Sequence, residues 1–76
     1  MAGARAALNE IKWARGGLAG TLIWFVHRGA PGDRRAVRGE EVLALGRGFI
    51  ELPDQTLIPY HRVLRIERDG EVLWER

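Results

Sequence analysis

The spacing of apolar residues predicts an amphipathic helix over residues 4–14. The apolar positions recur at intervals of three and four residues and are Ala4, Ala7, Leu8 and Ile11. Gly16-Gly17 follows directly and predicts the end of the helix. Trp13 lies about 140° from Leu8 around the helix axis, outside this stripe. We expect Trp13 to pack against the end of the helix.

Residues 21–27 have the composition of a β-strand, because β-branched and aromatic side chains dominate the segment. One alternating set is Leu22, Trp24 and Val26, and the other is Ile23, Phe25 and His27. Both sets are largely apolar, which predicts a central strand covered on both sides, with one side against the helix. His27 would then lie where the strand ends.

Two segments share a pattern that predicts the same local geometry twice. Residues 36–45 align on residues 57–66 without gaps, with apolar residues at both ends and four polar or turn-forming residues between them. We expect each segment to form a strand, a one-turn bend and a second strand. The first bend carries Gly39-Glu40-Glu41 and the second Tyr60-His61-Arg62, so only the second is suited to an anion.

Turn-forming residues separate the remaining strands. Glycine and proline in residues 28–35 argue against a strand there and predict a turn at Pro31-Gly32. The glycines of residues 46–48 predict a turn, a bulge or a close approach of the backbone before the strand-like residues 49–52.

Asp69-Gly70 predicts a β-hairpin. A two-residue turn would place Ile66 opposite Leu73 and Arg65 opposite Trp74, with Leu64, Ile66 and Leu73 on the buried face. Trp74 would then lie beside Arg65, either as a cation–π partner or as a stacking platform for a base.

These elements predict a single α+β domain over residues 1–76. We expect one N-terminal helix packed on a curved, mainly antiparallel sheet of five or six short strands, which could close into a barrel. The 76 residues are too few for a second domain. The chain has no cysteine and no apolar run long enough to span a membrane, so we expect a cytoplasmic protein that does not engage a membrane.

The charge and composition of the chain favour phosphate binding over metal or cofactor chemistry. Residues 1–38 carry seven basic and two acidic side chains, whereas residues 39–76 carry five and eight, and eleven of the twelve basic residues are arginine. Arginine favours bidentate phosphate contacts. Two histidines without cysteine are too few soft ligands for a metal site, and no phosphate-binding glycine motif or serine or cysteine nucleophile is present, so we expect no metal and no cofactor.

Two His-Arg pairs are the candidate residues for a phosphate-binding or catalytic site. His27-Arg28 follows one strand and His61-Arg62 lies in the bend after Pro59. If folding brings the pairs together, they would form a phosphate site, and two histidines could also act as acid and base. Gly29 and Gly32 could let backbone N–H groups approach the same phosphate. The alternative for each segment is a structural turn or a solvated loop.

The chain also resembles a known family. The resemblance lies in His-Arg-Gly-Ala-Pro-Gly-Asp at residues 27–33, Gly-Arg-Gly-Phe at 46–49, Ile-Pro-Tyr-His-Arg-Val-Leu-Arg-Ile at 58–66 and Val-Leu-Trp at 72–74. These strings look like a small, mainly archaeal family described as an RNA cyclic-group-end recognition domain. The resemblance implies recognition of RNA ends with a 2′,3′-cyclic phosphate and implies no established catalytic activity.

We therefore predict a non-catalytic RNA-binding module, with RNA or an RNA end as its partner. The predicted phosphate- and RNA-binding residues are His27, Arg28, Arg34, Arg35, Tyr60, His61, Arg62 and Trp74. Two alternatives stay open: a cyclic phosphodiesterase using His27 and His61, and a module that binds RNA-processing proteins. The sequence leaves the oligomeric state undetermined.

Overall fold

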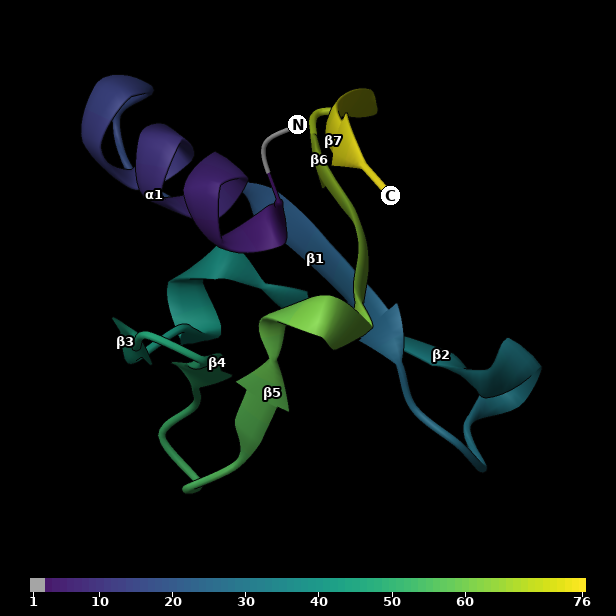
Figure 1. Cartoon of the computed structure of the whole chain (residues 1–76). Coiled ribbons are helices and arrows are strands. Elements are labelled where there is room, and N and C mark those ends of the chain that lie inside the picture. Colours follow the sequence, from purple (N-terminus) through teal and green to yellow (C-terminus); the bar gives the residue numbers. More distant parts are fainter. Residues whose placement is uncertain (1–2) are drawn as a thin grey trace.

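The computed structural model describes residues 3–76, which form one helix and two antiparallel sheets (Figure 1). The helix is α1 (Ala4–Ala14). The four-stranded sheet has the order β2 (Arg34–Arg38), β1 (Thr21–Val26), β6 (Val63–Arg68) and β7 (Glu71–Glu75). The three-stranded sheet has the order β3 (Ala44–Leu45), β4 (Phe49–Glu51) and β5 (Leu57–Pro59). The predicted α+β fold is confirmed, with the strands divided between two open sheets and not closed into a barrel.

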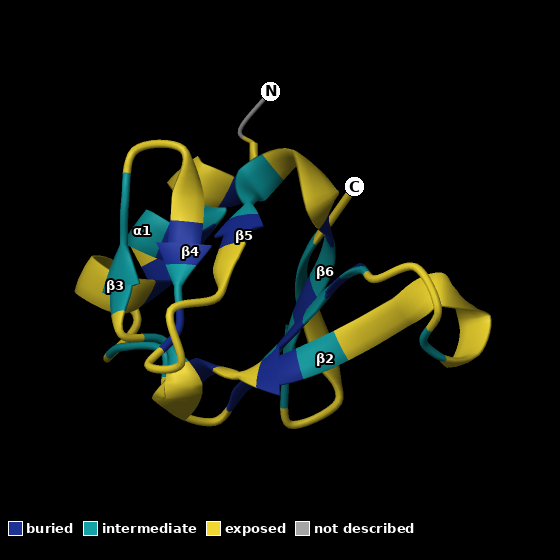
Figure 2. Ribbon diagram, turned by 90° about the horizontal axis from the view of Figure 1, so that it is seen from below, coloured by how far each residue is buried: buried dark blue, intermediate teal, exposed yellow. Residues whose placement is uncertain are grey.

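The helix and both sheets share one core. The predicted apolar stripe is confirmed, since Ala4, Leu8 and Ile11 are buried. They pack with the inner residues of the sheets, which are Ile23, Phe25, Val37, Ile50, Leu52, Ile58, Val63 and Ile66. Figure 2 shows these buried positions gathered between the two sheets and α1. Each large apolar side chain removed from water in this way contributes about 1.5–3 kcal/mol, so this shared core holds the layers together.

The two similar segments are the places where the chain crosses between the sheets. The first runs from β2 through a 3₁₀ turn at Gly39–Glu41 toward β3, and the second from β5 through a 3₁₀ turn at Tyr60–Arg62 into β6. In each turn an N–H donates back to the first turn residue, Val42 to Gly39 and Val63 to Tyr60. The predicted strand, bend and strand are therefore confirmed twice.

The β6–β7 hairpin turns at Asp69-Gly70, both with positive φ, as predicted. The predicted register beyond the turn is wrong. Glu67 pairs with Val72, but Ile66 pairs with Trp74 because Leu73 is an extra residue in a β-bulge. Arg65 consequently pairs with Glu75, and Trp74 packs against the core.

A second bulge changes the buried face of β6. Trp24 pairs with Arg65 and Phe25 with Val63, which leaves Leu64 as the extra residue. Val63 and Ile66 therefore point into the core, whereas Leu64 is half-buried. The prediction that Leu64 shares the buried face with Ile66 is wrong for this reason.

The central strand β1 is covered on only one of its faces. Thr21, Ile23 and Phe25 are buried, but the alternating residues Leu22, Trp24 and Val26 are half-buried. The core cluster lies on the side of Ile23 and Phe25. The prediction of a strand covered on both sides is therefore wrong for the face that carries Trp24.

Two further expectations fail near the ends of α1 and β1. Trp13 is 77% exposed, with the Lys12 ammonium 5.1 Å from the centre of its ring, and so does not pack at the helix end as predicted. Arg34 and Arg35 belong to strand β2, not to a loop. The irregular segment is therefore limited to residues 27–33. The predicted turn forms there as a 3₁₀ turn at Pro31–Asp33.

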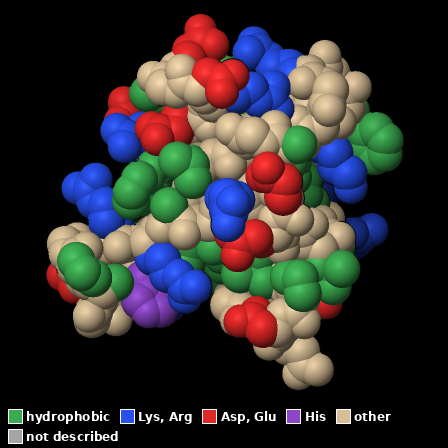
Figure 3. Space-filling view, turned by 180° about the vertical axis from the view of Figure 1, so that it is seen from behind, with side chains coloured by type: hydrophobic (Ala, Val, Ile, Leu, Met, Phe, Trp, Pro, Cys, Tyr) green, Lys and Arg blue, Asp and Glu red, His purple; other side chains and the backbone are tan. Residues whose placement is uncertain are grey.

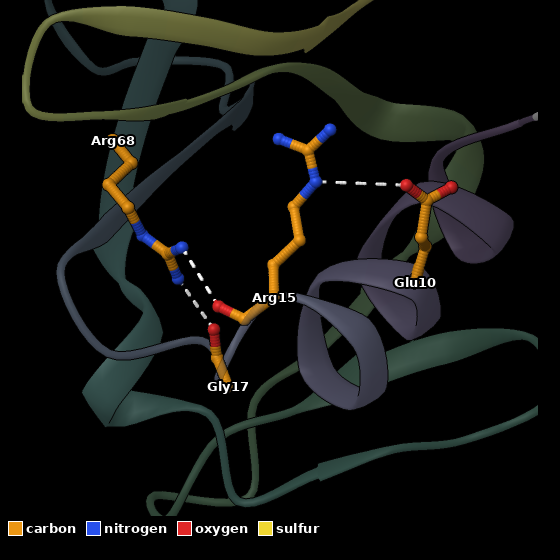
Figure 4. Close-up of polar contacts among 4 residues, drawn as sticks. All are labelled: Glu10, Arg15, Gly17 and Arg68. Atoms are coloured by element: carbon orange, nitrogen blue, oxygen red, sulfur yellow. Dashed lines mark hydrogen bonds and ion pairs between the residues drawn. The ribbon is translucent and has the colours of Figure 1, made fainter.

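Arg68 ties the end of the helix to β6 (Figure 4). Its guanidinium donates to the carbonyl oxygens of Arg15, Gly17 and Ala19 at 3.2, 2.6 and 3.2 Å. Carbonyl groups after a helix C-terminus lack helical partners and attract a positive charge. Arg68 satisfies them from a residue far away in the sequence. Over residues 3–76, no helix combines the length and apolar character needed to cross a membrane.

Candidate functional site

The loop between β1 and β2 projects from the body of the protein and is exposed (Figures 1 and 2). It is closed by its own backbone: the His27 N–H donates to the Asp33 carbonyl at 2.9 Å, and the Ala30 N–H to the His27 carbonyl at 3.2 Å. The Gly29 N–H donates to the Asp33 carboxylate at 3.3 Å. That N–H therefore has a partner within the loop. The prediction that it faces a phosphate does not agree with this contact.

His27, Arg28 and Arg62 meet at a common hollow of about 340 Å³, completed by Val26. The sheet register explains their meeting. Phe25 of β1 pairs with Val63 of β6 in antiparallel order, so the residues that follow β1 lie beside those that precede β6. The strand pairing thus joins His27-Arg28 to Arg62 across 34 residues of sequence.

A second, smaller hollow of about 200 Å³ adjoins the first, because His27, Val26 and Arg62 line both. Its other lining residues are mainly apolar and are Phe25, Thr56, Leu57, Ile58 and Pro59. The His27 ring stands edge-on to Phe25, with ring centres 6.1 Å apart and planes at 83°. This contact orients the imidazole at the boundary between a basic and an apolar surface.

The 3₁₀ turn at Tyr60–Arg62 is held at three points. The Tyr60 hydroxyl donates to the Gly46 carbonyl at 2.7 Å, and the Tyr60 N–H donates to the Gly48 carbonyl at 3.3 Å. The His61 carbonyl accepts from Arg76 Nη1 at 2.8 Å. Burial raises the pKa of Tyr60 above its ordinary value of 10.0, with nearby Arg5 acting in the opposite direction. Tyr60 therefore remains a neutral donor that fixes the bend and with it Arg62.

The other predicted site residues lie apart from these hollows. His61 is exposed and lies outside both of them. Arg34 and Arg35 are exposed on β2, opposite Val26 and Phe25 of β1. Trp74 is half-buried and, together with Ala7, Ile11 and Leu73, lines a small hollow of about 110 Å³ beside α1.

The charge at the first hollow suits an anion. Its four lining residues supply two guanidinium groups and one imidazole, and acidic side chains are not among these four. Figure 3 shows lysine or arginine side chains and a histidine side by side on the side of the molecule from which the loop projects. Guanidinium groups from two separate segments can each donate in bidentate fashion to phosphate oxygens.

The fold and this hollow define a small α+β protein with a basic surface where β1 ends. The chain belongs to the MJ1316 RNA cyclic group end recognition domain family, whose model matches residues 1–76. The family predicted from the sequence is thereby confirmed.

Relatives of the chain are archaeal and carry only general names. The UPF0248 protein MK0350 of Methanopyrus kandleri is 42% identical over 55 residues, which are 72% of this chain and 73% of that protein. The UPF0248 protein TK0315 of Thermococcus kodakarensis is 44% identical over 64% of this chain and 59% of its own length. A UPF0248 protein of Metallosphaera sedula is 32% identical over 91% of this chain and 86% of its own length. No solved structure matches the chain.

Sequence reasoning found the charged residues of the hollow but missed the long-range hydrogen bonds that hold the backbone of the fold. Arg68 and Arg76 donate to backbone carbonyls 15 to 53 residues away. A carbonyl group is present at every position, so the sequence carries no signal for these partners. The sequence predicted a turn, a bulge or a close backbone approach at Gly46, but not that its carbonyl accepts the hydrogen bond from Tyr60.

Proposed function

We propose that this protein binds the phosphorylated ends of RNA, preferring a 2′,3′-cyclic phosphate, without catalysing its hydrolysis. The observation that carries the proposal is the meeting of His27, Arg28 and Arg62 at one hollow. The terminal phosphate would accept hydrogen bonds from Arg28 and Arg62, with His27 as a further donor. The description of the matching family supports the choice of ligand.

The neighbouring apolar hollow supports a cyclic end in particular. A cyclic phosphate is fused to its ribose, so a site for it should place an apolar surface directly beside the cationic groups. Leu57, Ile58 and Pro59 provide such a surface next to Arg62. A cyclic phosphodiester carries a single negative charge, for which two guanidinium groups are sufficient.

The arrangement of the histidines favours binding over hydrolysis. Cleavage of a cyclic phosphodiester by a histidine pair needs both rings within hydrogen-bond reach of groups on one phosphorus. His27 lines the hollow, whereas His61 lies outside it and the half-buried Tyr60 is engaged with Gly46. His61, Arg34 and Arg35 would instead meet the RNA backbone around the site, a contact that weakens with added salt.

The test compares short RNA oligonucleotides of one sequence that end in a 2′,3′-cyclic phosphate, a 3′-phosphate or a 3′-hydroxyl. We expect the cyclic end to bind most tightly and Arg62→Gln to weaken its binding about tenfold or more, the loss of a hydrogen bond to a charged group. Lys12→Gln, which removes a positive charge at an exposed position of α1, is the matched control and should change little.

Three results would overturn the proposal. Equal affinity for the three ends would leave only general RNA binding, and no RNA binding together with capture of an RNA-processing protein would favour a protein-interaction module. Release of a nucleoside monophosphate from a cyclic nucleotide, abolished by His27→Gln and His61→Gln, would show an enzyme instead.

A further inference from the structure

The outer face of the four-stranded sheet carries a further hollow that the proposed end site does not use. It measures about 300 Å³ and is lined by Trp24, Arg34, Leu64, Arg65, Glu75 and Arg76. These residues come from all four strands of the sheet and the residue after β7. The hollow lies on the face of β1 opposite the core, where Leu22, Trp24 and Val26 are half-buried.

The hydrophobic core lies on the face of β1 opposite Trp24. The core is built on the opposite side of β1 by Ile23 and Phe25, and Trp24 is not part of it. Leu64 reaches the outer face only because the bulge in β6 leaves it as the extra residue. The outer face of the sheet therefore carries an aromatic and an aliphatic side chain that are both half-buried and lie outside the core.

The polar groups around Trp24 are suited to a nucleotide. The Arg65 guanidinium lies over the Trp24 ring, with its carbon 5.8 Å from the ring centre, and its Nε is 3.2 Å from a Glu67 carboxylate oxygen. Within residues 3–76, the buried Trp24 Nε1 has no hydrogen-bond partner. An aromatic ring beside arginines binds a base by stacking and its phosphate by charge, largely without regard to base identity.

This outer hollow and the end site of His27, Arg28 and Arg62 are neighbours along β1. Trp24 and Val26 are two residues apart on one face of the strand, a separation of about 7 Å. Val26 lines the end site, and Arg34, which lines the outer hollow, pairs directly with Val26. An RNA chain that enters the end site at Arg28 can therefore reach Trp24 with the neighbouring nucleotide.

We propose that the hollow around Trp24 is a second RNA subsite, which stacks the base of the nucleotide preceding the RNA end and contacts its phosphate through Arg34. This inference rests on the proposed function, because it places the preceding nucleotide relative to an end bound by His27, Arg28 and Arg62. This subsite makes the protein bind an RNA with a cyclic end more tightly than a free cyclic mononucleotide. It accepts any base, because stacking depends little on base identity.

The experiment separates the two sites by ligand length. Affinity is measured for a mononucleotide 2′,3′-cyclic phosphate and for di- and tetranucleotides with the same end. The wild-type protein should gain affinity from the mononucleotide to the dinucleotide. Trp24→Leu, which keeps an apolar side chain on the sheet, should reduce dinucleotide affinity about 5- to 100-fold and leave mononucleotide affinity unchanged.

Arg34→Glu provides a second variant, because this exposed residue can change without disturbing the core. It should reduce the gain with length about tenfold, whereas the matched Lys12→Glu on α1 should not. The three indole N–H resonances of the protein give a direct readout. The Trp24 resonance should shift with the dinucleotide and not with the mononucleotide.

The outcomes distinguish the two proposals. If the mononucleotide binds and Arg62→Gln weakens it, but Trp24→Leu and Arg34→Glu leave the gain with length intact, the subsite is refuted and the end site stands. If the mononucleotide does not bind while oligonucleotides bind through Trp24 and Arg34, the end site is refuted and the sheet face binds RNA by itself. If no RNA binds, both are overturned.

Discussion

The hydroxyl of Tyr60 donates a hydrogen bond of 2.7 Å to the carbonyl oxygen of Gly46, from the bend before β6 to the turn between β3 and β4. This contact holds the bend that carries Arg62 against the three-stranded sheet. Tyr60 thus acts on the candidate site through its position, since its ring packs against the core and its hydroxyl is engaged.

The ionisation of Tyr60 should be displaced to high pH. Burial raises its pKa above the ordinary 10.0, so the folded state favours the neutral phenol. The resulting contribution to stability is complete below pH 10 and is lost as the pH rises through the folded-state pKa. The chain has a single tyrosine, so tyrosinate absorbance during an alkaline titration measures this group alone. A midpoint at or below 10 would contradict the prediction.

Gly39→Ala should destabilise the fold strongly. A Cβ atom at Gly39 would overlap the Leu18 carbonyl and the Thr21 hydroxyl, which are themselves hydrogen-bonded at 2.6 Å. We expect a loss of about 1–3 kcal/mol or more in the free energy of unfolding, measured by urea denaturation. Gly48→Ala is the matched control, because a Cβ there would meet open space. Equal effects of the two substitutions would show that the close approach at Gly39 is unimportant.

Arg68→Ala should lower stability more than Arg15→Ala. Arg68 donates to three carbonyls after α1, and its loss leaves them without these partners at a cost of about 1–3 kcal/mol. Arg15 makes only an exposed ion pair with Glu10 at 3.7 Å, worth about 0–1 kcal/mol (Figure 4). Thermal denaturation of both variants measures the difference, and hydrogen exchange at residues 15–19 should rise only in Arg68→Ala. Similar melting temperatures for the two variants would argue against an anchoring role for Arg68.

Trp13→Ser should leave the folded state almost unchanged. The side chain is 77% exposed and touches Lys12 from the same helix, so its removal forfeits little burial. We expect a change within about 0.5 kcal/mol, as for other surface substitutions. Trp74→Ser is the contrasting variant and should destabilise by several times as much, because Trp74 packs against the core. A large loss for Trp13→Ser would show that the ring is buried in solution.

Local patterns in the sequence were sufficient for the helix, the Asp69-Gly70 turn and both strand–bend–strand segments. Each depends on residues close together in the chain: the apolar stripe of α1, the positive φ of Asp69 and Gly70, or the polar interruption between apolar residues. The candidate residues His27, Arg28 and Arg62 were likewise predicted from their chemistry. The sequence did not show that these three residues lie close together in the fold.

Only the tertiary structure decided register and proximity. The bulge at Leu73 moves Trp74 away from Arg65, and the bulge at Leu64 places the Leu64 side chain on the outer face of the sheet, beside Arg65 and Trp24. A bulge depends on how two strands fit a shared core, and no residue pattern within one strand specifies it. For the same reason the sequence determined which residues could bind a phosphate, and the pairing of β1 with β6 determined which of them meet.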